Sequence, residues 1–172
     1  INPMGMSKRL CELVLMSQIA PVSNKKTVRF GNVLNSSGSV IPIFKDQIER
    51  GGPILVTHPD AKRYFMSIGQ AVSLVLSTDT LSSGTYILDM GNSVKILDLA
   101  YNLAAQNNLR IVDDPQSSEE IGIEYIGLRE GEKLEEKLSF GRVTQTEKIG
   151  VLRVHEEVSD NKNFLMEILA FI

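Results

Sequence analysis

The sequence predicts an α/β fold. Three observations lead to this prediction: apolar residues recur at helical spacing in several segments, short segments rich in β-branched residues lie between them, and glycine, proline or asparagine residues mark the boundaries. The two kinds of segment alternate along the chain, which is typical of α/β proteins. Hydrophobic residue types make up 42% of the 172 residues, which is enough for a buried core.

The first element is a predicted helix over residues 3–20. Asn2 is a preferred N-cap residue, Pro3 suits the first helical position, and Pro21 ends the pattern. Apolar residues occupy two stripes of this helix, so we expect it to be well buried and to pack on two sides. The stripes consist of Met4, Cys11, Leu15 and Ile19, interrupted by Lys8, and of Met6, Leu10, Leu13 and Val14.

A strand and a second helix follow. Residues 27–34 are β-rich and contain a glycine, and they predict a core strand that ends near Asn32. Residues 35–39 are of turn-forming types, so they predict a loop. A helix is then expected from about residue 40 to residue 50, where a pair of glycines stops it.

The middle of the chain predicts a strand, a helix and another strand. Residues 54–57 form a short apolar segment. Ser67 and Gln70 have the spacing of a capping box ahead of apolar residues at helical intervals, which predicts a helix that reaches Leu76. A strand is expected over residues 85–90 because glycine precedes a β-rich segment there.

The last predicted elements are a helix, a strand and a short helix. Apolar residues at helical spacing place the longer helix at about residues 94–106. Alternation of apolar residues predicts a strand over residues 121–125, and a short helix is expected over residues 132–138. Residues 112–120 and 141–163 are polar, so we expect mobile loops there.

The charge of the chain excludes several classes of protein. With 18 basic and 21 acidic residues the net charge is −3, which argues against a broad binding surface for nucleic acid or for anionic membranes. An anionic ligand must therefore be held by a few local basic groups. A single cysteine excludes an internal disulfide and a cysteine-based zinc site, and two histidines are too few for most metal sites, so we expect no metal.

The chain shows neither a membrane-spanning segment nor a signal peptide. No apolar run approaches the roughly 18 residues needed to cross a bilayer, and the first residues lack the basic and then apolar pattern of a signal peptide. We therefore expect a soluble, cytoplasmic protein. The chain begins at Ile1 rather than at a methionine, directly before a strong helix start, so we expect it to be a piece of a longer protein.

Lys8 is the first residue that suggests chemistry, because it interrupts an apolar stripe. A buried lysine is costly unless it has a partner. Either its ammonium group reaches solvent past the neighbouring side chains, or it is presented to a ligand, where an ammonium can hold ribose hydroxyls.

Asn32, Arg63 and Arg129 lie at the ends of predicted elements. Asn32 follows a core strand, at the place where open α/β sheets bind ligands, although an asparagine there also suits an ordinary turn. The two arginines suit a clamp for a diphosphate, because a guanidinium forms paired hydrogen bonds with phosphate oxygens. Solvated surface charges are the alternative interpretation.

Other kinds of site are less well supported. The sequence contains no Gly-x-Gly-x-x-Gly or Walker-type loop, so it lacks the usual backbone cradle for a dinucleotide pyrophosphate. It contains no Gly-x-Ser-x-Gly motif either, and Cys11 suits a packed helix better than a catalytic nucleophile.

Several segments together resemble the extended short-chain dehydrogenase/reductases that act on nucleotide sugars, and in particular the polysaccharide-biosynthesis UDP-N-acetylglucosamine 4,6-dehydratases. They follow one another in order over about residues 1–140. The matching segments are Asn2-Pro-Met-Gly-Met-Ser-Lys8, Val28-Arg-Phe-Gly-Asn-Val-Leu34 with Gly38-Ser-Val-Ile-Pro-Ile-Phe44, Thr57-His-Pro-Asp60 with Arg63-Tyr-Phe-Met66, Leu88-Asp-Met-Gly91 with Lys95-Ile-Leu-Asp-Leu99, and Gly127-Leu-Arg-Glu-Gly-Glu-Lys-Leu134.

The resemblance implies an NAD-dependent, redox-neutral dehydration. The cofactor takes a hydride from sugar C4, water is eliminated across C5 and C6, and the hydride returns to C6, which gives a UDP-linked 4-keto-6-deoxy sugar. Lys8 corresponds to the lysine of the family's Tyr-x-x-x-Lys motif and contacts the nicotinamide ribose, and Phe30 also lies at the cofactor. Met4 replaces the tyrosine of that motif, as is characteristic of this dehydratase branch, and a thioether cannot act as a base.

The resemblance also implies that parts of the enzyme are missing from this chain. The glycine-rich cofactor loop and a Thr-Asp-Lys segment for proton transfer lie before the position of Ile1 in the family. We therefore expect the chain to be the carboxyl-terminal part of such an enzyme, inactive by itself, that needs an amino-terminal NAD domain as its partner. Some relatives are tethered to a membrane by helices further upstream.

The remaining residues resemble the substrate half of the site. The resemblance implies that Asn32 contacts the diphosphate region and that Ser39 and Val40 contact the nucleotide. It further implies that Arg63 and Arg129 contact the diphosphate and that Glu132 lies near the uridine ribose. The implied substrate is a UDP-N-acetylhexosamine.

The implied architecture is an incomplete Rossmann-type parallel sheet plus a small α/β substrate-binding lobe. Residues 1–33 and 62–90 are expected to form the remainder of the Rossmann-type NAD domain, residues 34–61 and 91–140 the substrate-binding lobe, and residues 141–172 a tail without assigned structure. Exposed sheet edges and unpaired apolar faces favour homo-oligomers.

Two alternatives remain open. A nucleotide-sugar C4-epimerase of the same superfamily needs only an oxidation and a reversed reduction, although such enzymes normally use the tyrosine that Met4 replaces. A non-catalytic module that binds UDP-sugar is the second alternative.

Overall fold

The computed structural model describes residues 3–17, 23–34, 36, 38–139 and 141–155. These residues form two compact units, which are described separately. Unit 1 is built from the described residues within 1–30, 69–89 and 137–155, and unit 2 from the described residues within 31–68 and 90–136. No helix of the described part is long and apolar enough to cross a membrane.

Unit 1 contains a mixed sheet in the strand order β1-β6-β12-β11. Strand β1 (Lys26–Arg29) runs parallel to β6 (Gly84–Leu88), with Val28 opposite Tyr86. Strand β12 (Val151–His155) runs antiparallel to β6, and β11 (Arg142–Gln145) runs antiparallel to β12. Tyr86, Leu88 and Val151 are almost fully buried and form the centre of this sheet.

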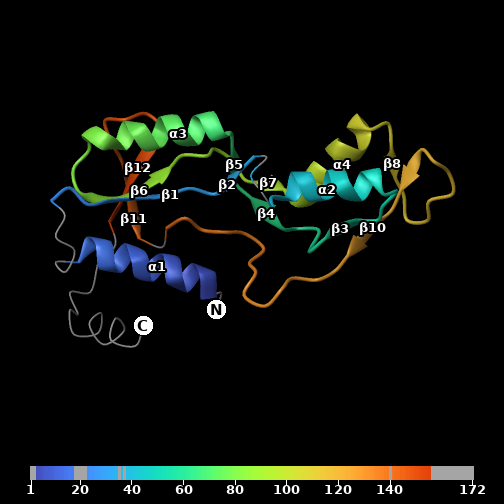
Figure 1. The fold of residues 1–172 in the computed structure, drawn as a ribbon, viewed down its shortest axis with the longest axis horizontal. Helices are drawn as coiled ribbons and strands as arrows, with labels where there is room; N and C mark the ends of the chain where they lie inside the picture. The colour runs from blue at the N-terminus through green and yellow to red at the C-terminus, as the bar shows by residue number, and fades with distance from the viewer. Residues whose placement is uncertain (1–2, 18–22, 35, 37, 140, 156–172) are drawn as a thin grey trace. The chain divides into compact units, whose positions relative to one another are not determined.

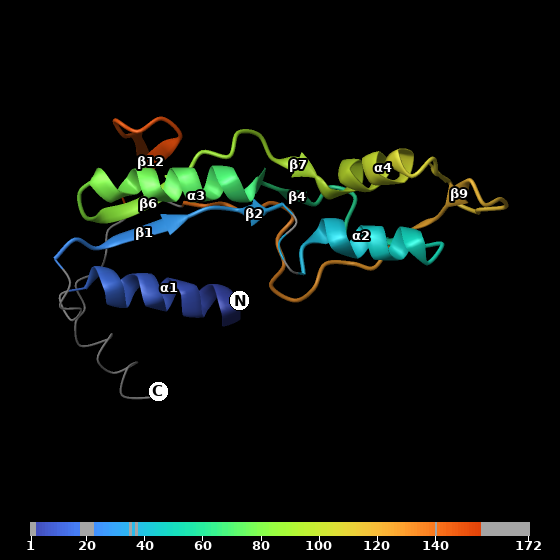
Figure 2. The same cartoon turned by 45° about the horizontal axis from the view of Figure 1, so that its top comes forward.

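In the described part of unit 1, two helices cover the sheet. Helix α1 (Pro3–Met16) and helix α3 (Ile68–Ser77) lie on opposite faces of the sheet, as the two views in Figure 1 and Figure 2 show. A 3-10 turn, η1 (Thr78–Thr80), follows α3, and the Tyr86 hydroxyl donates a hydrogen bond to the Ser82 carbonyl beside it. This arrangement is a three-layer α/β unit.

The burial predicted for the first helix is wrong. Helix α1 has no buried residue, and Met4 and Met6 are exposed, while Leu10, Leu13 and Val14 are half-buried. The physical reason is that only one face of α1 packs against the sheet. The predicted end of this helix, residues 18–20, lies outside the described residues.

The described residues of unit 2 form two helices and four pairs of short strands. Helix α2 (Val40–Glu49) buries Phe44 and Ile48, and helix α4 (Ile96–Gln106) buries four residues at helical spacing. The parallel pairs are β2 (Asn32–Val33) with β5 (Phe65–Met66), β3 (Ile54–Val56) with β10 (Ile123–Tyr125), and β8 (Arg110–Ile111) with β9 (Glu120–Ile121); β4 (Lys62–Arg63) pairs with β7 (Val94–Lys95) in antiparallel orientation.

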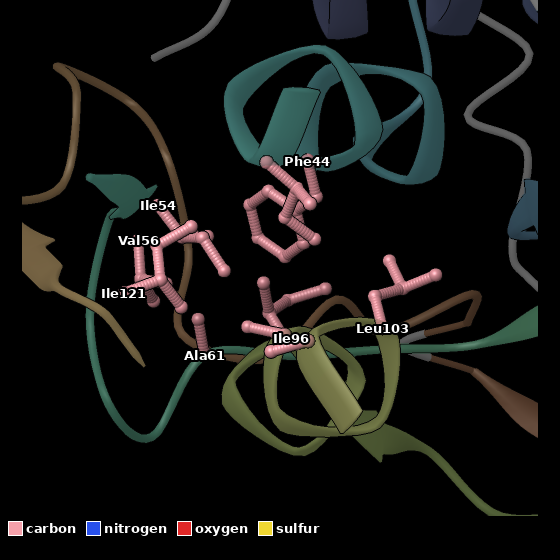
Figure 3. Close-up of a cluster of buried hydrophobic side chains, with 10 residues drawn as sticks. Phe44, Ile54, Val56, Ala61, Ile96, Leu103 and Ile121 are labelled. Carbon is pink, nitrogen blue, oxygen red and sulfur yellow. The ribbon is translucent and has the colours of Figure 1, made fainter. Parts of the chain in front are cut away.

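The core of unit 2 lies between its helices and β3. Figure 3 shows the Phe44 ring of α2 pointing towards Ile96 of α4, with Ile54 and Val56 of β3 beside them. These residues are at most 8% exposed, and the i and i+4 spacing of Phe44 and Ile48 faces both into the core. The α/β fold class predicted from the sequence is therefore confirmed.

Three predicted elements differ in the structure. The segment 27–34 is divided at Phe30 and Gly31 into two strands that belong to different sheets. Residues 132–138 are not helical, because the Leu134 carbonyl accepts a hydrogen bond from the Lys62 backbone N–H at 2.7 Å instead of from its own segment. Residues 141–155 are not a loop, because β11 and β12 complete the sheet of unit 1.

The compact units also divide the chain differently from the predicted boundaries. Residues 62–68 were expected with the Rossmann-type part, but they belong to unit 2 because β4 and β5 pair with β7 and β2. Residues 141–155 belong to unit 1 rather than to a separate tail, because β12 pairs with β6.

Candidate functional site

Asn32 occupies the start of β2, in the short parallel pair with β5. Its backbone N–H donates to the Tyr64 carbonyl at 2.9 Å, and the Leu34 N–H donates to the Met66 carbonyl at 2.9 Å. These two bonds fix the backbone on both sides of the Asn32 side chain, which is half-buried. The asparagine is therefore held in place by its neighbouring strand rather than by a local turn.

Gly31 allows this close approach of β2 to Tyr64. A β-carbon at Gly31 would lie 3.0 Å from both the Cβ and the carbonyl oxygen of Tyr64, and 3.1 Å from the Met90 sulfur. Real β-carbon contacts are rarely so short, and the Tyr64 carbonyl is backbone that cannot turn away. Any larger residue would push β2 away from β5 and move Asn32.

Ser39 and Val40 form the N-terminal end of α2. Ser39 is the N-cap residue, but its side chain makes no capping hydrogen bond. Within the described residues, its hydroxyl oxygen is buried and has no hydrogen-bond partner. The first N–H groups of a helix attract anions, and a buried hydroxyl without a partner can be satisfied by a ligand. Val40 is half-buried and packs against the core of unit 2.

Arg63 is the most deeply buried charged group of the site. Its side chain is 10% exposed. One terminal nitrogen, Nη1, donates to the carbonyls of Lys62 at 2.8 Å and Leu134 at 3.1 Å. The other, Nη2, donates to Oε1 of Glu132 at 2.9 Å. The guanidinium thus connects β4 to the segment that contains Arg129 and Glu132.

Glu132 connects Arg63 to Arg129. Its Oε1 also accepts a weak hydrogen bond from the Thr57 hydroxyl at 3.4 Å, and its Oε2 accepts one from the Arg129 backbone N–H at 3.2 Å. The Glu132 N–H donates to the Arg129 carbonyl at 2.9 Å. These bonds close a tight turn over residues 129–132, with the Arg129 side chain exposed and able to meet a ligand.

The structure therefore brings Arg63, Glu132 and Arg129 together in unit 2. Sequence reasoning missed Thr57, whose hydroxyl reaches Glu132, and Glu136, whose Oε1 lies 3.8 Å from Arg63 Nε. Thr57 is the last residue of the predicted strand 54–57 and directly follows β3 in the structure, at the kind of strand end where ligands bind, so a signal was present. No local pattern indicated Glu136.

The predicted cofactor residues lie in unit 1. Lys8 is exposed on α1, and Met4, one turn before it, is 60% exposed on the same side of the helix. Phe30 is 39% exposed at the end of β1. Within unit 1, Lys8 is therefore exposed to solvent, and its ammonium group is accessible to a ligand.

The residues of this chain fit an NAD molecule only in part. An exposed ammonium such as that of Lys8 suits the hydroxyls of a nicotinamide ribose. The pyrophosphate has no cradle here, because the sequence contains no glycine-rich βα turn. In the described residues no group of three or more His, Cys, Asp or Glu side chains could hold a metal ion.

Unit 1 also contains a hollow of about 470 Å³, whose lining includes Arg9, Glu12 and Arg153. Its charges already have partners: Arg9 pairs with Glu12 at 2.9 Å, and Arg153 donates to the Ser82 hydroxyl at 2.7 Å. We therefore do not assign a ligand to it.

Comparison with known proteins identifies the family. The fold is the Rossmann-type α/β fold of epimerase and dehydratase enzymes. The family described as Polysaccharide biosynthesis protein matches residues 1–156, so the chain belongs to this family.

Curated relatives support the assignment. The chain is 50% identical over 143 residues to the capsular polysaccharide biosynthesis protein CapD of Staphylococcus aureus, and 48% identical over 141 residues to the probable polysaccharide biosynthesis protein EpsC of Bacillus subtilis (strain 168). Each match covers 80% of this chain and 22% of the relative, so the chain spans about a fifth of the length of these proteins. A UDP-glucose 4-epimerase of Rickettsia rickettsii is 34% identical over 147 residues, which are 80% of this chain and 39% of that protein.

Solved structures show the same fold. The protein Pen of Bacillus thuringiensis matches with a TM-score of 0.70 at 28% identity over 89% of this chain and 46% of that one. A UDP-N-acetylglucosamine 4-epimerase of Methanobrevibacter ruminantium M1, in complex with UDP-N-acetylmuramic acid, matches with a TM-score of 0.60 at 18% identity over 99% of this chain and 55% of its own. The NAD-dependent NDP-hexosamine 5,6-dehydratase TunA matches with a TM-score of 0.59 at 18% identity over 81% and 45% of the two chains.

Proposed function

We propose that this chain is the nucleotide-sugar-binding part of an NAD-dependent UDP-N-acetylglucosamine 4,6-dehydratase. The enzyme would make a UDP-linked 4-keto-6-deoxy sugar for polysaccharide biosynthesis. The observation that carries the proposal is the group of Arg63, Glu132 and Arg129 in unit 2. The Glu132 carboxylate accepts hydrogen bonds from the Arg63 guanidinium and from the Arg129 backbone N–H, and the exposed Arg129 side chain suits a diphosphate. The identity to CapD and EpsC supports the role in polysaccharide synthesis.

The residues of unit 2 would bind and orient the substrate. Arg129 offers an exposed charge to the diphosphate, and Asn32 offers an amide on a backbone fixed by β5. The Ser39 hydroxyl and the first N–H groups of α2 offer donors to the nucleotide, while Glu132 accepts hydrogen bonds and suits ribose hydroxyls.

Unit 1 would contribute to the cofactor site. When bound, NAD supplies the hydride acceptor and donor of the reaction. Lys8 would hold the nicotinamide ribose, with Phe30 beside the cofactor. Met4 has no group that takes or gives a proton near neutral pH, so acid and base catalysis would come from residues outside this chain. By itself the chain would therefore bind substrate without catalysing the reaction.

Titration calorimetry of the chain with UDP-N-acetylglucosamine and with NAD tests this proposal. We expect measurable binding of the UDP-sugar and no tight binding of NAD, because the pyrophosphate cradle is missing. Tight NAD binding by this chain would contradict the assignment of the cofactor cradle to residues outside it. Failure to bind the UDP-sugar would contradict the substrate role of unit 2.

A nucleotide-sugar 4-epimerase is the second candidate, and the similarity to the Rickettsia rickettsii protein favours it. Met4 argues against it, because the epimerase reaction needs a proton acceptor at that place. Mass spectrometry of the product made by the longer enzyme separates the two: a dehydratase removes one water from the UDP-sugar, whereas an epimerase leaves its mass unchanged.

The parent enzyme is also proposed to form homo-oligomers. Helix α1 exposes Met4, Met6 and Cys11, and exposed apolar side chains on one helix favour association. Size-exclusion chromatography with light scattering tests this, and a strictly monomeric protein over a wide concentration range would contradict it.

A further inference from the structure

Arg63 contacts several other parts of unit 2, although it was expected to touch the substrate. We infer that Arg63 is a positioning residue: it holds the turn at residues 129–132 on β4 and acts on a bound nucleotide diphosphate through Glu132 and Arg129. This inference rests on the proposed function, because it takes the ligand of unit 2 to be a nucleotide diphosphate.

The hydrogen-bonding groups of Arg63 are directed into the protein. Both hydrogens of Nη1 are accounted for by the Lys62 and Leu134 carbonyls, and Nη2 donates to Glu132. The Nε group faces Glu136 at 3.8 Å. With only 10% of the side chain exposed, the guanidinium has little surface left for a ligand.

These contacts determine where Arg129 lies. The Leu134 carbonyl is held from two sides, by Arg63 Nη1 at 3.1 Å and by the Lys62 N–H at 2.7 Å. Arg63 fixes the Glu132 carboxylate through Oε1, and the same carboxylate holds the Arg129 backbone through Oε2. The chain of contacts therefore runs from β4 through one carboxylate to the backbone of the exposed arginine.

Arg63 also changes the electrostatic field at the turn. Without it, Glu132 would be a partly buried carboxylate with no cationic guanidinium donor, held by the weak 3.4 Å bond from Thr57 and the 3.2 Å bond from the Arg129 N–H, and its charge would repel a diphosphate. With Arg63 in place the charge of Glu132 is compensated, so the positive charge of Arg129 acts on the ligand unopposed.

The first test uses the ligand-free chain. Amide hydrogen exchange at Arg129, Glu132 and Lys62 should become about tenfold faster or more in Arg63→Ala. The substitution removes the hydrogen bonds that hold Leu134 and Glu132, which accept hydrogen bonds from the Lys62 and Arg129 amides. Arg63→Lys should restore little, since an ammonium cannot reach two carbonyls and a carboxylate in one plane. Unchanged exchange at these amides in Arg63→Ala would overturn the inference.

Two controls keep this result specific. Arg50→Ala removes an arginine of unit 2 that pairs only on the surface with Asp46, at 75% exposure, and should leave the turn unchanged. Exchange at Val56, in the core strand β3, reports whether unit 2 is still folded. Fast exchange at Val56 in Arg63→Ala would indicate general unfolding, and Arg63→Lys would then be the variant used for the test.

The second test is a double-mutant cycle of UDP affinity with Arg63→Ala and Arg129→Ala. If Arg63 acts through Arg129, the double variant should bind UDP with about the same affinity as the single variant that binds UDP less tightly. Independent contacts to the diphosphate would instead give additive losses, which would overturn the inference. If the unmodified chain did not bind UDP, the proposed function and the diphosphate part of this inference would both fail, while the exchange measurements would still decide whether Arg63 holds the turn.

Discussion

Glu12 of α1 and Arg29 of β1 form a two-point ion pair in unit 1. Arg29 Nε donates to Oε1 of Glu12 at 2.7 Å, and Nη2 donates to Oε2 at 2.8 Å. The two side chains are 16% and 18% exposed, so water screens the pair only in part. The pair attaches the helix that contains Lys8 to the strand that ends beside Phe30.

This pair predicts a pH-dependent stability. Burial by itself raises the pKa of Glu12, but hydrogen bonds from Arg29 and then from Arg9 outweigh burial and hold this pKa below the usual value of 4.5. A pKa that is lower in the folded state contributes stability above the usual pKa and loses it as the pH falls through the lowered value. Glu12→Gln should therefore reduce the free energy of unfolding by about 1–3 kcal/mol at pH 7 and by much less in acid.

Urea denaturation of both proteins across a pH series measures this difference. Glu147→Gln, at an exposed position of the same unit, is the matched control and should change little at any pH. If Glu12→Gln lowered the free energy of unfolding by the same amount in acid as at neutral pH, the ion pair would not be the cause of the loss.

Gly31→Ala is predicted to destabilise the contact between β2 and β5. The new β-carbon would lie 3.0 Å from the Tyr64 carbonyl, so the two strands must separate, at a cost of about 1–3 kcal/mol. Thermal denaturation measures the loss. Gly69→Ala is the control: its β-carbon meets nothing within 4 Å and it lies in helix α3, so it should be stabilising by up to about 1 kcal/mol. Equal effects of the two substitutions would show that β2 and β5 tolerate the extra atom.

Ser39→Ala should separate stability from binding. The buried hydroxyl makes no capping bond, so its removal should leave the free energy of unfolding unchanged or raise it by about 1 kcal/mol. If a nucleotide is the partner of this hydroxyl, UDP affinity should fall about fivefold, which corresponds to about 1 kcal/mol. Denaturation and calorimetry on the same protein measure both quantities.

Ser77→Ala is the matched control for Ser39→Ala. The Ser77 hydroxyl donates to the Leu74 carbonyl at 2.7 Å, so its removal should cost about 0.5–1 kcal/mol of stability and leave UDP binding unchanged. A marked loss of stability in Ser39→Ala, without a change in UDP affinity, would assign the hydroxyl to the fold instead of the ligand.

Arg129→Ala should weaken UDP binding about tenfold, which corresponds to about 1.4 kcal/mol, because an exposed guanidinium is lost from the diphosphate. This loss of UDP affinity should be smaller at high salt, since exposed charges are screened. Arg110→Ala removes an equally charged group that is 76% exposed and paired with Glu120, and it should leave UDP binding unchanged. Calorimetry at two salt concentrations tests the prediction, and equal affinities for both variants would refute it.

Local patterns predicted much of the secondary structure of this chain. Helices α2 and α4 begin at Val40 and Ile96, within a few residues of the predicted starts. The prediction succeeds because the apolar residues of each helix recur at helical spacing and face a single core. The order of motifs likewise predicted the family, which the match to residues 1–156 confirms. The individual roles of Lys8, Asn32 and Arg129 remain predictions that the experiments above test.

The sequence by itself determined the α/β class, because helical and strand periodicity depend on residues close together in the chain. Only the tertiary structure decided that the segment 27–34 divides at Gly31, that residues 132–138 are not helical, and that residues 141–155 add two strands to the sheet of unit 1. Each of these depends on hydrogen bonds between distant residues, such as Lys62 with Leu134 and Asp89 with Gly150. The burial of Arg63 has the same origin: the side chain is charged and would be solvated in isolation, but the carbonyl and carboxylate groups brought to it by the fold replace the water.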